Sequence, residues 1–156
     1  MRRDHFELEA HNVDWVETND PPAEPRVVID FDGPKETLTQ RLTGTNGDLL
    51  DASETDVAFR LQDSLNASDA TGVVGVTDRI TGDFLLELNE NADDVLRFVR
   101  AAREYGQSTG DAGKYAVTLR VDGEPVTTYS KSTFLVYDAN GSLLRSKSLI
   151  PSGVEL

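Results

Sequence analysis

The chain has 156 residues, the usual size of a single domain. Its 28 acidic residues outnumber the 15 Lys and Arg, so the formal net charge is −13 and no cation excess is left for nucleic-acid phosphates. The absence of cysteine excludes disulfides and thiolate metal sites. No stretch approaches the roughly 18 apolar residues of a membrane-spanning helix, and no apolar run follows Met1-Arg2-Arg3 as in a secretory signal. We therefore expect a cytoplasmic domain that binds neither nucleic acid nor membrane.

Most apolar residues alternate with polar ones at a period of two, which is the pattern of strands buried on one face. In chain order this pattern predicts strands over residues 6–10, 27–31, 57–61, 74–76, 84–88, 115–121, 126–128, 134–137 and 143–150. Residues 38–43 fit either a strand or a short helix. Asn46-Gly47 and Asp122-Gly123 predict tight turns, because such pairs tolerate positive φ.

One segment has the period of an amphipathic helix, over residues 92–105. Asn91 is a suitable N-cap, and the carboxylates of the first turn suit the positive end of the helix dipole. Gly106 is expected to end the helix. The residues predicted to form its buried face are Val95, Phe98, Val99, Ala102 and Tyr105.

Short strands, frequent turns and one helix predict a mainly β, α+β domain over residues 1–156, arranged as an antiparallel β-sandwich or barrel. Asp111-Ala112-Gly113-Lys114-Tyr115 resembles the tyrosine-corner segment of immunoglobulin-like domains. This resemblance implies an immunoglobulin-like sandwich, with Tyr115 as its corner tyrosine.

An apolar strand that ends in Asp30-Phe31-Asp32-Gly33 resembles the first motif of haloacid-dehalogenase-type phosphatases. The resemblance implies that Asp30 is a nucleophile and Asp32 an acid/base. The motif usually continues with Thr, where this chain has Pro34, and the parent fold needs parallel strands that alternate with helices. A hydrolase, or a binder of a small ligand or cation, that uses Asp30 and Asp32 is therefore the second hypothesis.

The two histidines, His5 and His11, lack a third ligand at metal-binding spacing. No nucleophile elbow and no phosphate-binding glycine loop accompanies them. We therefore predict no catalytic residue, no metal ligand and no cofactor, and we lean against an enzyme.

A basic stripe with an aliphatic residue marks the polar side of the predicted helix: Leu96, Arg97, Arg100 and Arg103. Leu96 points about 100° away from Val95 at 3.6 residues per turn, so we expect it to be exposed among the arginines. Arginine beside an exposed aliphatic side chain favours a docking patch for an acidic partner. The alternative is a solvated helix face, with Arg97 paired to Asp93.

Several segments spread over the chain resemble a family of small haloarchaeal proteins: Asn12-Val13-Asp14-Trp15-Val16, residues 51–61, residues 100–106 and residues 148–156. That family is a domain of unknown function, so the resemblance implies a salt-rich cytoplasm and no particular site residue. Together with the basic stripe, it favours a non-catalytic interaction or scaffold module that binds a protein partner or a second copy of itself.

The net charge of −13 predicts that salt stabilises the fold. Self-repulsion is screened as the Debye length falls to roughly 3 Å at 1 M salt. We expect the free energy of unfolding to rise between about 0.1 M and about 2 M KCl. Urea unfolding followed by circular dichroism measures this, and equal midpoints at the two salt concentrations would contradict it.

Overall fold

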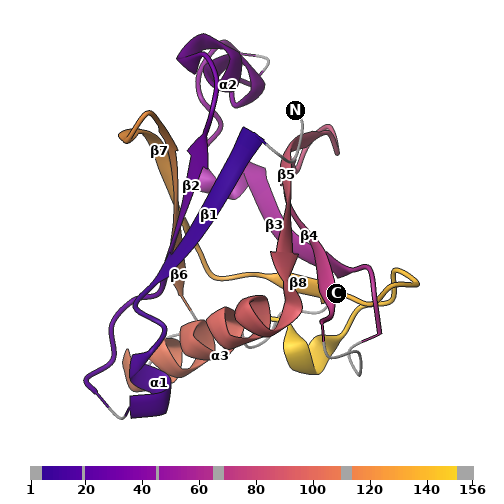
Figure 1. Cartoon of the computed structure of the whole chain (residues 1–156). Coiled ribbons are helices and arrows are strands. Elements are labelled where there is room, and N and C mark those ends of the chain that lie inside the picture. The colour runs from indigo at the N-terminus through magenta and orange to yellow at the C-terminus, as the bar shows by residue number, and fades with distance from the viewer. Residues whose placement is uncertain (1–4, 19, 45, 65–68, 110–113, 151–156) are drawn as a thin grey trace.

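The computed structural model describes residues 5–18, 20–44, 46–64, 69–109 and 114–150. Two four-stranded sheets stand opposite each other, and the long helix α3 lies across one end of the space between them (Figure 1). The first sheet has the order β1-β2-β6-β7 and the second β5-β4-β3-β8.

The strands are β1 (Phe6–His11), β2 (Arg26–Phe31), β3 (Thr55–Leu61), β4 (Thr71–Asp78), β5 (Phe84–Asn91), β6 (Tyr115–Val121), β7 (Glu124–Lys131) and β8 (Leu135–Tyr137). The helices are α1 (Trp15–Thr18), α2 (Lys35–Arg41), α3 (Ala92–Thr109) and the 3₁₀ turns η2 (Ala52–Glu54) and η3 (Arg145–Lys147). None of the helices in the described ranges has the length and hydrophobicity of a transmembrane span.

Both sheets are mixed. The pairs β1–β2, β6–β7, β3–β4 and β4–β5 are antiparallel, whereas β2–β6 and β3–β8 are parallel. The predicted mainly β domain with one amphipathic helix is confirmed. The sheets form a sandwich-like pair without a closed barrel, and their two parallel pairs depart from the expected antiparallel pattern.

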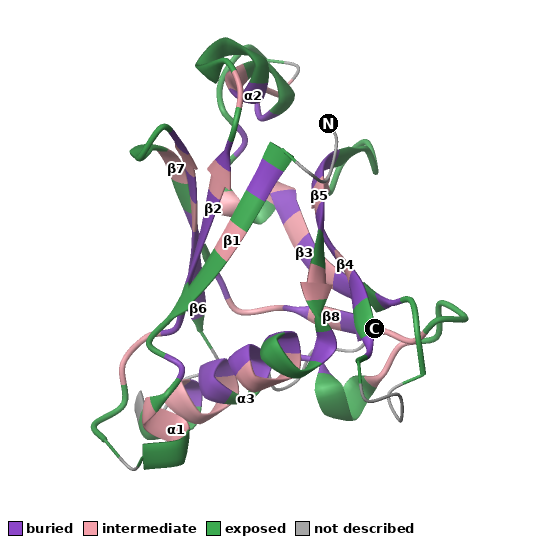
Figure 2. Cartoon of the chain, viewed as in Figure 1, coloured by how far each residue is buried: buried purple, intermediate pink, exposed green. Residues whose placement is uncertain are grey.

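The period of two is reproduced in the burial of the strands. Buried residues, purple in Figure 2, alternate along β3 and along the second half of β6, whereas β2 has three buried residues in a row. Buried residues also line the side of α3 that faces the sheets. The apolar side chains of both inner faces meet in one core with the helix. Burial of each of the larger ones contributes about 1.5–3 kcal/mol to stability.

Helix α3 begins where β5 ends. The side-chain oxygen of Asn91 accepts hydrogen bonds from the backbone N–H groups of Asp93 (2.9 Å) and Asp94 (3.3 Å), which confirms the predicted N-cap. The helix does not end at Gly106. It continues to Thr109, and Gly106 is buried within it, so this glycine does not serve as a C-cap.

The segment 143–150 was expected to be a strand and is not one. It makes isolated bridges, between Tyr137 and Leu143 and between Phe134 and Leu149, on either side of the 3₁₀ turn η3. Leu144 packs against the core, and Ser148 and Leu149 are buried, whereas residues 145–147 are exposed. The ambiguous segment 38–43 lies mostly in helix α2.

Tyr115 is not a tyrosine corner. Its hydroxyl donates a 2.6 Å hydrogen bond to the carbonyl oxygen of Thr133, which follows it in the chain, whereas a tyrosine corner bonds to backbone that precedes it. Residues 111–113 of the expected motif lie outside the described residues. The immunoglobulin-like interpretation therefore loses the feature on which it rested.

Three aromatic rings connect the two sheets and the helix. The ring of Phe98 on α3 lies 5.4 Å from that of Tyr115 on β6 and 6.3 Å from that of Phe134, which precedes β8. Tyr115 and Phe134 are themselves 5.9 Å apart and T-shaped. Edge-to-face ring pairs add to the free energy of burying the rings, so this cluster stabilises the junction of all three layers.

A buried lysine forms a second connection between the sheets. Lys131, at the end of β7, donates through Nζ to the carbonyl oxygens of Ala52 and Thr55, both at 2.6 Å. Burial lowers the pKa of Lys131, and the nearby positive charge of Arg79 lowers it further. The ammonium thus ties the edge of the first sheet to η2 and the start of β3.

Gly72 provides a test of packing in the second sheet. A Cβ at this position would lie 2.4 Å from the carbonyl oxygen of Arg60 and 2.6 Å from the ring of Phe59. We expect Gly72→Ala to lower the free energy of unfolding by about 1–3 kcal/mol, because backbone must move. Gly75→Ala is the matched control, since its Cβ would come no closer than 3.4 Å to any atom. Urea titrations that show equal losses for both variants would contradict this account.

Candidate interaction groove on helix α3

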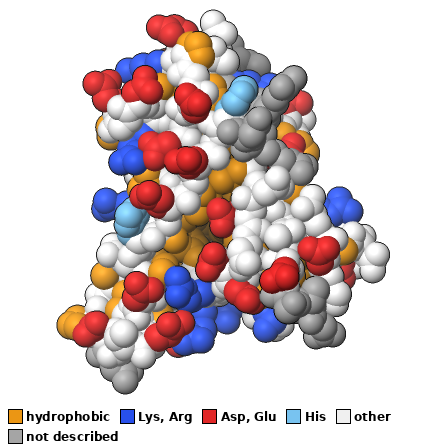
Figure 3. Space-filling view, viewed as in Figure 1, with side chains coloured by type: hydrophobic (Ala, Val, Ile, Leu, Met, Phe, Trp, Pro, Cys, Tyr) orange, Lys and Arg blue, Asp and Glu red, His pale blue; other side chains and the backbone are white. Residues whose placement is uncertain are grey.

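The outer side of α3 borders a groove of about 500 Å³. The predicted basic stripe lies in it, and α1 and η3 add further charged residues. Its lining residues are Glu17, Asp93, Asp94, Leu96, Arg97, Val99, Arg100, Arg103, Ser146 and Lys147. Figure 3 shows a cluster of Lys and Arg side chains (blue) at the foot of the molecule, on a surface that elsewhere displays many carboxylates (red). The structure therefore brings together all four residues of the predicted patch.

Arg103 mainly stabilises one wall of the groove. Its Nη2 donates to the carbonyl oxygens of Ser148 (2.7 Å) and Ser146 (3.2 Å), which attaches α3 to the segment around η3. Hydrogen bonds from a charged donor to backbone carbonyls are strong. Arg103 thus has a structural role that helical spacing alone does not reveal.

Arg97 does not pair with Asp93 as the alternative interpretation proposed. Its Nη1 lies 3.6 Å from Oδ1 of Asp14, a residue just before α1. The Nε atom of Arg97 is buried and has no hydrogen-bond partner. Because this Nε is shielded from solvent, an anionic partner would contact the terminal amino groups of Arg97, whose side chain is 39% exposed.

Leu96 is partly buried and packs against the core, so the expectation that it lies exposed is wrong. The helix contacts η3 as well as the sheets, and it is therefore covered on more than one side. Replacement of Leu96 by Asp would cost stability, which makes it a poor test of binding.

Arg100 and Lys147 are the accessible cations of the groove. Both are exposed, and neither forms an ion pair within the described ranges. Their charges remain available to a ligand, whereas those of Arg97 and Arg103 are partly engaged. The groove therefore combines two anchored and two free cations.

Asp30 and Asp32 do not form a joint site. The carboxylate of Asp30 accepts two hydrogen bonds from Arg120, from Nε at 2.8 Å and from Nη2 at 2.7 Å. This pairing lowers the pKa of Asp30. Asp32 follows β2 and is exposed. Because both oxygens of Asp30 are occupied, the geometry does not present it as a nucleophile or as a cation ligand.

The two histidines have different neighbours and do not form a joint site. His11 Nε2 is 3.5 Å from a carboxylate oxygen of Glu9, and the ring of His5 packs edge-on to Phe31. Within the described part of the chain, no group of three or more His, Asp or Glu side chains is placed to hold a metal ion. Neither histidine lines the groove.

The chain belongs to a family of unknown function (DUF5793), whose model matches residues 1–156. No curated protein and no solved structure matches the chain. The expected membership of a domain family of unknown function is thereby confirmed, and the haloarchaeal source stays a prediction. The match carries over no catalytic or binding residue, so function has to be argued from the geometry.

Substitution of Asp30 tests whether this position is structural. We expect Asp30→Asn to lower the free energy of unfolding by about 0.2–1 kcal/mol at pH 7, the range of a largely solvated ion pair. Because the pKa of Asp30 is lowered in the folded chain, this stability is present above the ordinary aspartate pKa of 3.8 and is lost as the pH falls below it. Urea titrations at pH 7 and pH 3 measure the difference.

Asp32→Asn is the matched control and should change stability little, because Asp32 is exposed. Mg²⁺-dependent phosphatase turnover in the parent that disappears in Asp30→Asn would instead revive the nucleophile hypothesis.

Proposed function

We propose that the chain is a non-catalytic interaction module that docks an acidic segment of another protein in the α3 groove. The observation that carries this proposal is the concentration of cations there. Four of them line the groove against three carboxylates, in a chain whose net charge is −13. A local reversal of charge on an acidic surface selects for carboxylate-bearing partners.

The chemistry of the groove supports the same kind of partner. The guanidinium groups present planar donors that match carboxylates, and the exposed part of Leu96 supplies apolar contact, whereas Val99 is buried. Arginine beside apolar side chains is the composition of protein contact surfaces. A protein segment with acidic and aliphatic residues would use both features.

We further propose a salt-rich cytoplasm as the setting, on the strength of the acidic composition. In molar salt the arginine charges are screened, so hydrogen bonds and apolar contacts would supply more of the affinity than long-range attraction. Binding should therefore weaken with KCl but persist.

The test uses a fluorescent peptide of alternating Glu and Leu, with a Lys–Leu peptide of the same length for comparison. We expect the parent to bind the acidic peptide and not the basic one in fluorescence anisotropy. The double variant Arg100→Glu, Lys147→Glu should bind at least tenfold more weakly in 0.5 M KCl, because both exposed cations become anions.

The matched control is Lys35→Glu, a charge reversal at the exposed first residue of α2, which lies at the opposite end of the molecule from α3 (Figure 1). It should leave peptide binding unchanged. Sedimentation in molar KCl then separates partner binding from self-association. Two results would overturn the proposal of a foreign acidic partner. In one, the groove variant binds the acidic peptide as tightly as the parent does. In the other, the parent forms concentration-dependent dimers that the groove variant does not form.

A further inference from the structure

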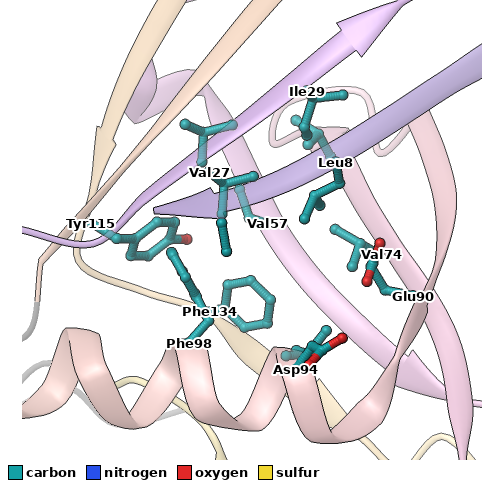
Figure 4. Close-up of a pocket in the computed structure, with 14 residues that line it drawn as sticks. Leu8, Val27, Ile29, Val57, Val74, Glu90, Asp94, Phe98, Tyr115 and Phe134 are labelled. Carbon is teal, nitrogen blue, oxygen red and sulfur yellow. The ribbon is translucent and has the colours of Figure 1, made fainter. Parts of the chain in front are cut away.

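A second hollow lies between the inner faces of the two sheets, above α3 (Figure 4). Its volume is about 40 Å³, or about 490 Å³ when the space open to solvent is included. Figure 3 shows the opening as a strip of apolar surface (orange) with carboxylates beside it. The apolar residues of its walls include Leu8 on β1, Ile29 on β2, Val57 on β3, Val74 on β4, and Phe98 on α3.

Two carboxylates, those of Glu90 and Asp94, line the otherwise apolar hollow (Figure 4). Glu90 continues the inward-facing series of Leu86 and Leu88 on β5, a position where alternation calls for an apolar residue. Asp94 lies in the first turn of α3, and both carboxylates are drawn on the same side of the hollow. The chain thus places two negative charges at one end of an apolar space.

Neither carboxylate is neutralised by the protein. In the described ranges neither forms an ion pair, and the one hydroxyl among the lining side chains, that of Tyr115, donates its hydrogen bond to Thr133. Burial raises the pKa of Glu90, a hydrogen bond from the Asn91 backbone N–H opposes this, and the charge of Asp94 raises it further. Asp94 is exposed and Glu90 is half-buried. A half-buried carboxylate next to another is unfavourable until a cation binds beside it.

We propose that this hollow is a binding site for a small protonated amine with a short apolar tail. The ammonium would lie between Glu90 and Asp94, and the tail would enter the space beside Val74 and Phe98. The volume of about 40 Å³ limits the tail to one or two carbon atoms. This site differs in place and in charge from the α3 groove, and the inference does not rest on the proposed function.

Three probes of equal length test the proposal: ethylammonium, ethanol and acetate. We expect ethylammonium to shift the amide signals of Leu8, Val74 and Glu90 saturably in a ¹H–¹⁵N titration of the full chain in 0.5 M KCl. Acetate should bind at least tenfold more weakly, and ethanol should fall between the two. Glu90→Gln should weaken the amine at least tenfold and remove its advantage over ethanol.

Two further variants make the outcome decisive. Glu87→Gln removes the same charge from the opposite face of β5 and should leave amine binding unchanged. Ala10→Trp, at an exposed position of β1 that borders the hollow, should block the amine while the amide spectrum elsewhere stays that of the folded parent. Equal shifts with amine and carboxylate, or undiminished amine binding by Glu90→Gln or by Ala10→Trp, would overturn the site.

Discussion

The contact of Phe98 with Tyr115 and Phe134 holds the architecture together, because each ring belongs to a different layer. Helix α3 lies across one end of the two sheets, and Lys131 joins them through η2. Beside the helix the inner faces leave a hollow of about 40 Å³ that their side chains do not fill. The apolar hollow and the outer groove are therefore two sides of the same helix, and Asp94 lines both.

The local structure was largely predictable, and the pairing of strands was not. Alternation showed which residues face inward, and Asn91 marked the start of α3, because these signals lie within a few residues of sequence. The parallel neighbours of β2 and β3 come from distant parts of the chain, and alternation carries no information about them. The extension of α3 through Gly106 reflects burial of that glycine, which outweighs its poor helix propensity.

The two candidate sites also differ in how far the sequence alone could predict them. The arginine stripe followed from helical spacing, but the partners of Arg97 and Arg103 lie just before α1 and around η3 and could not be foreseen. The hollow needs both sheets and the helix in place. One local signal did exist, since Glu90 interrupts the apolar series of β5, and a charge at an inward position is a departure from strand patterning that points to a site.

The parallel pairing of β2 with β6 also determines how the chain can fold. It places Asp30 beside Arg120, 90 residues further along, whereas β3, β4 and β5 are connected by short segments. Closing so long a loop costs conformational entropy. The two strands can pair only after the chain between them has been synthesised. High contact order of this kind slows folding. We therefore expect the β3–β4–β5 meander with α3 to form early, and the first sheet to assemble around β6 only when nearly the whole chain has been synthesised.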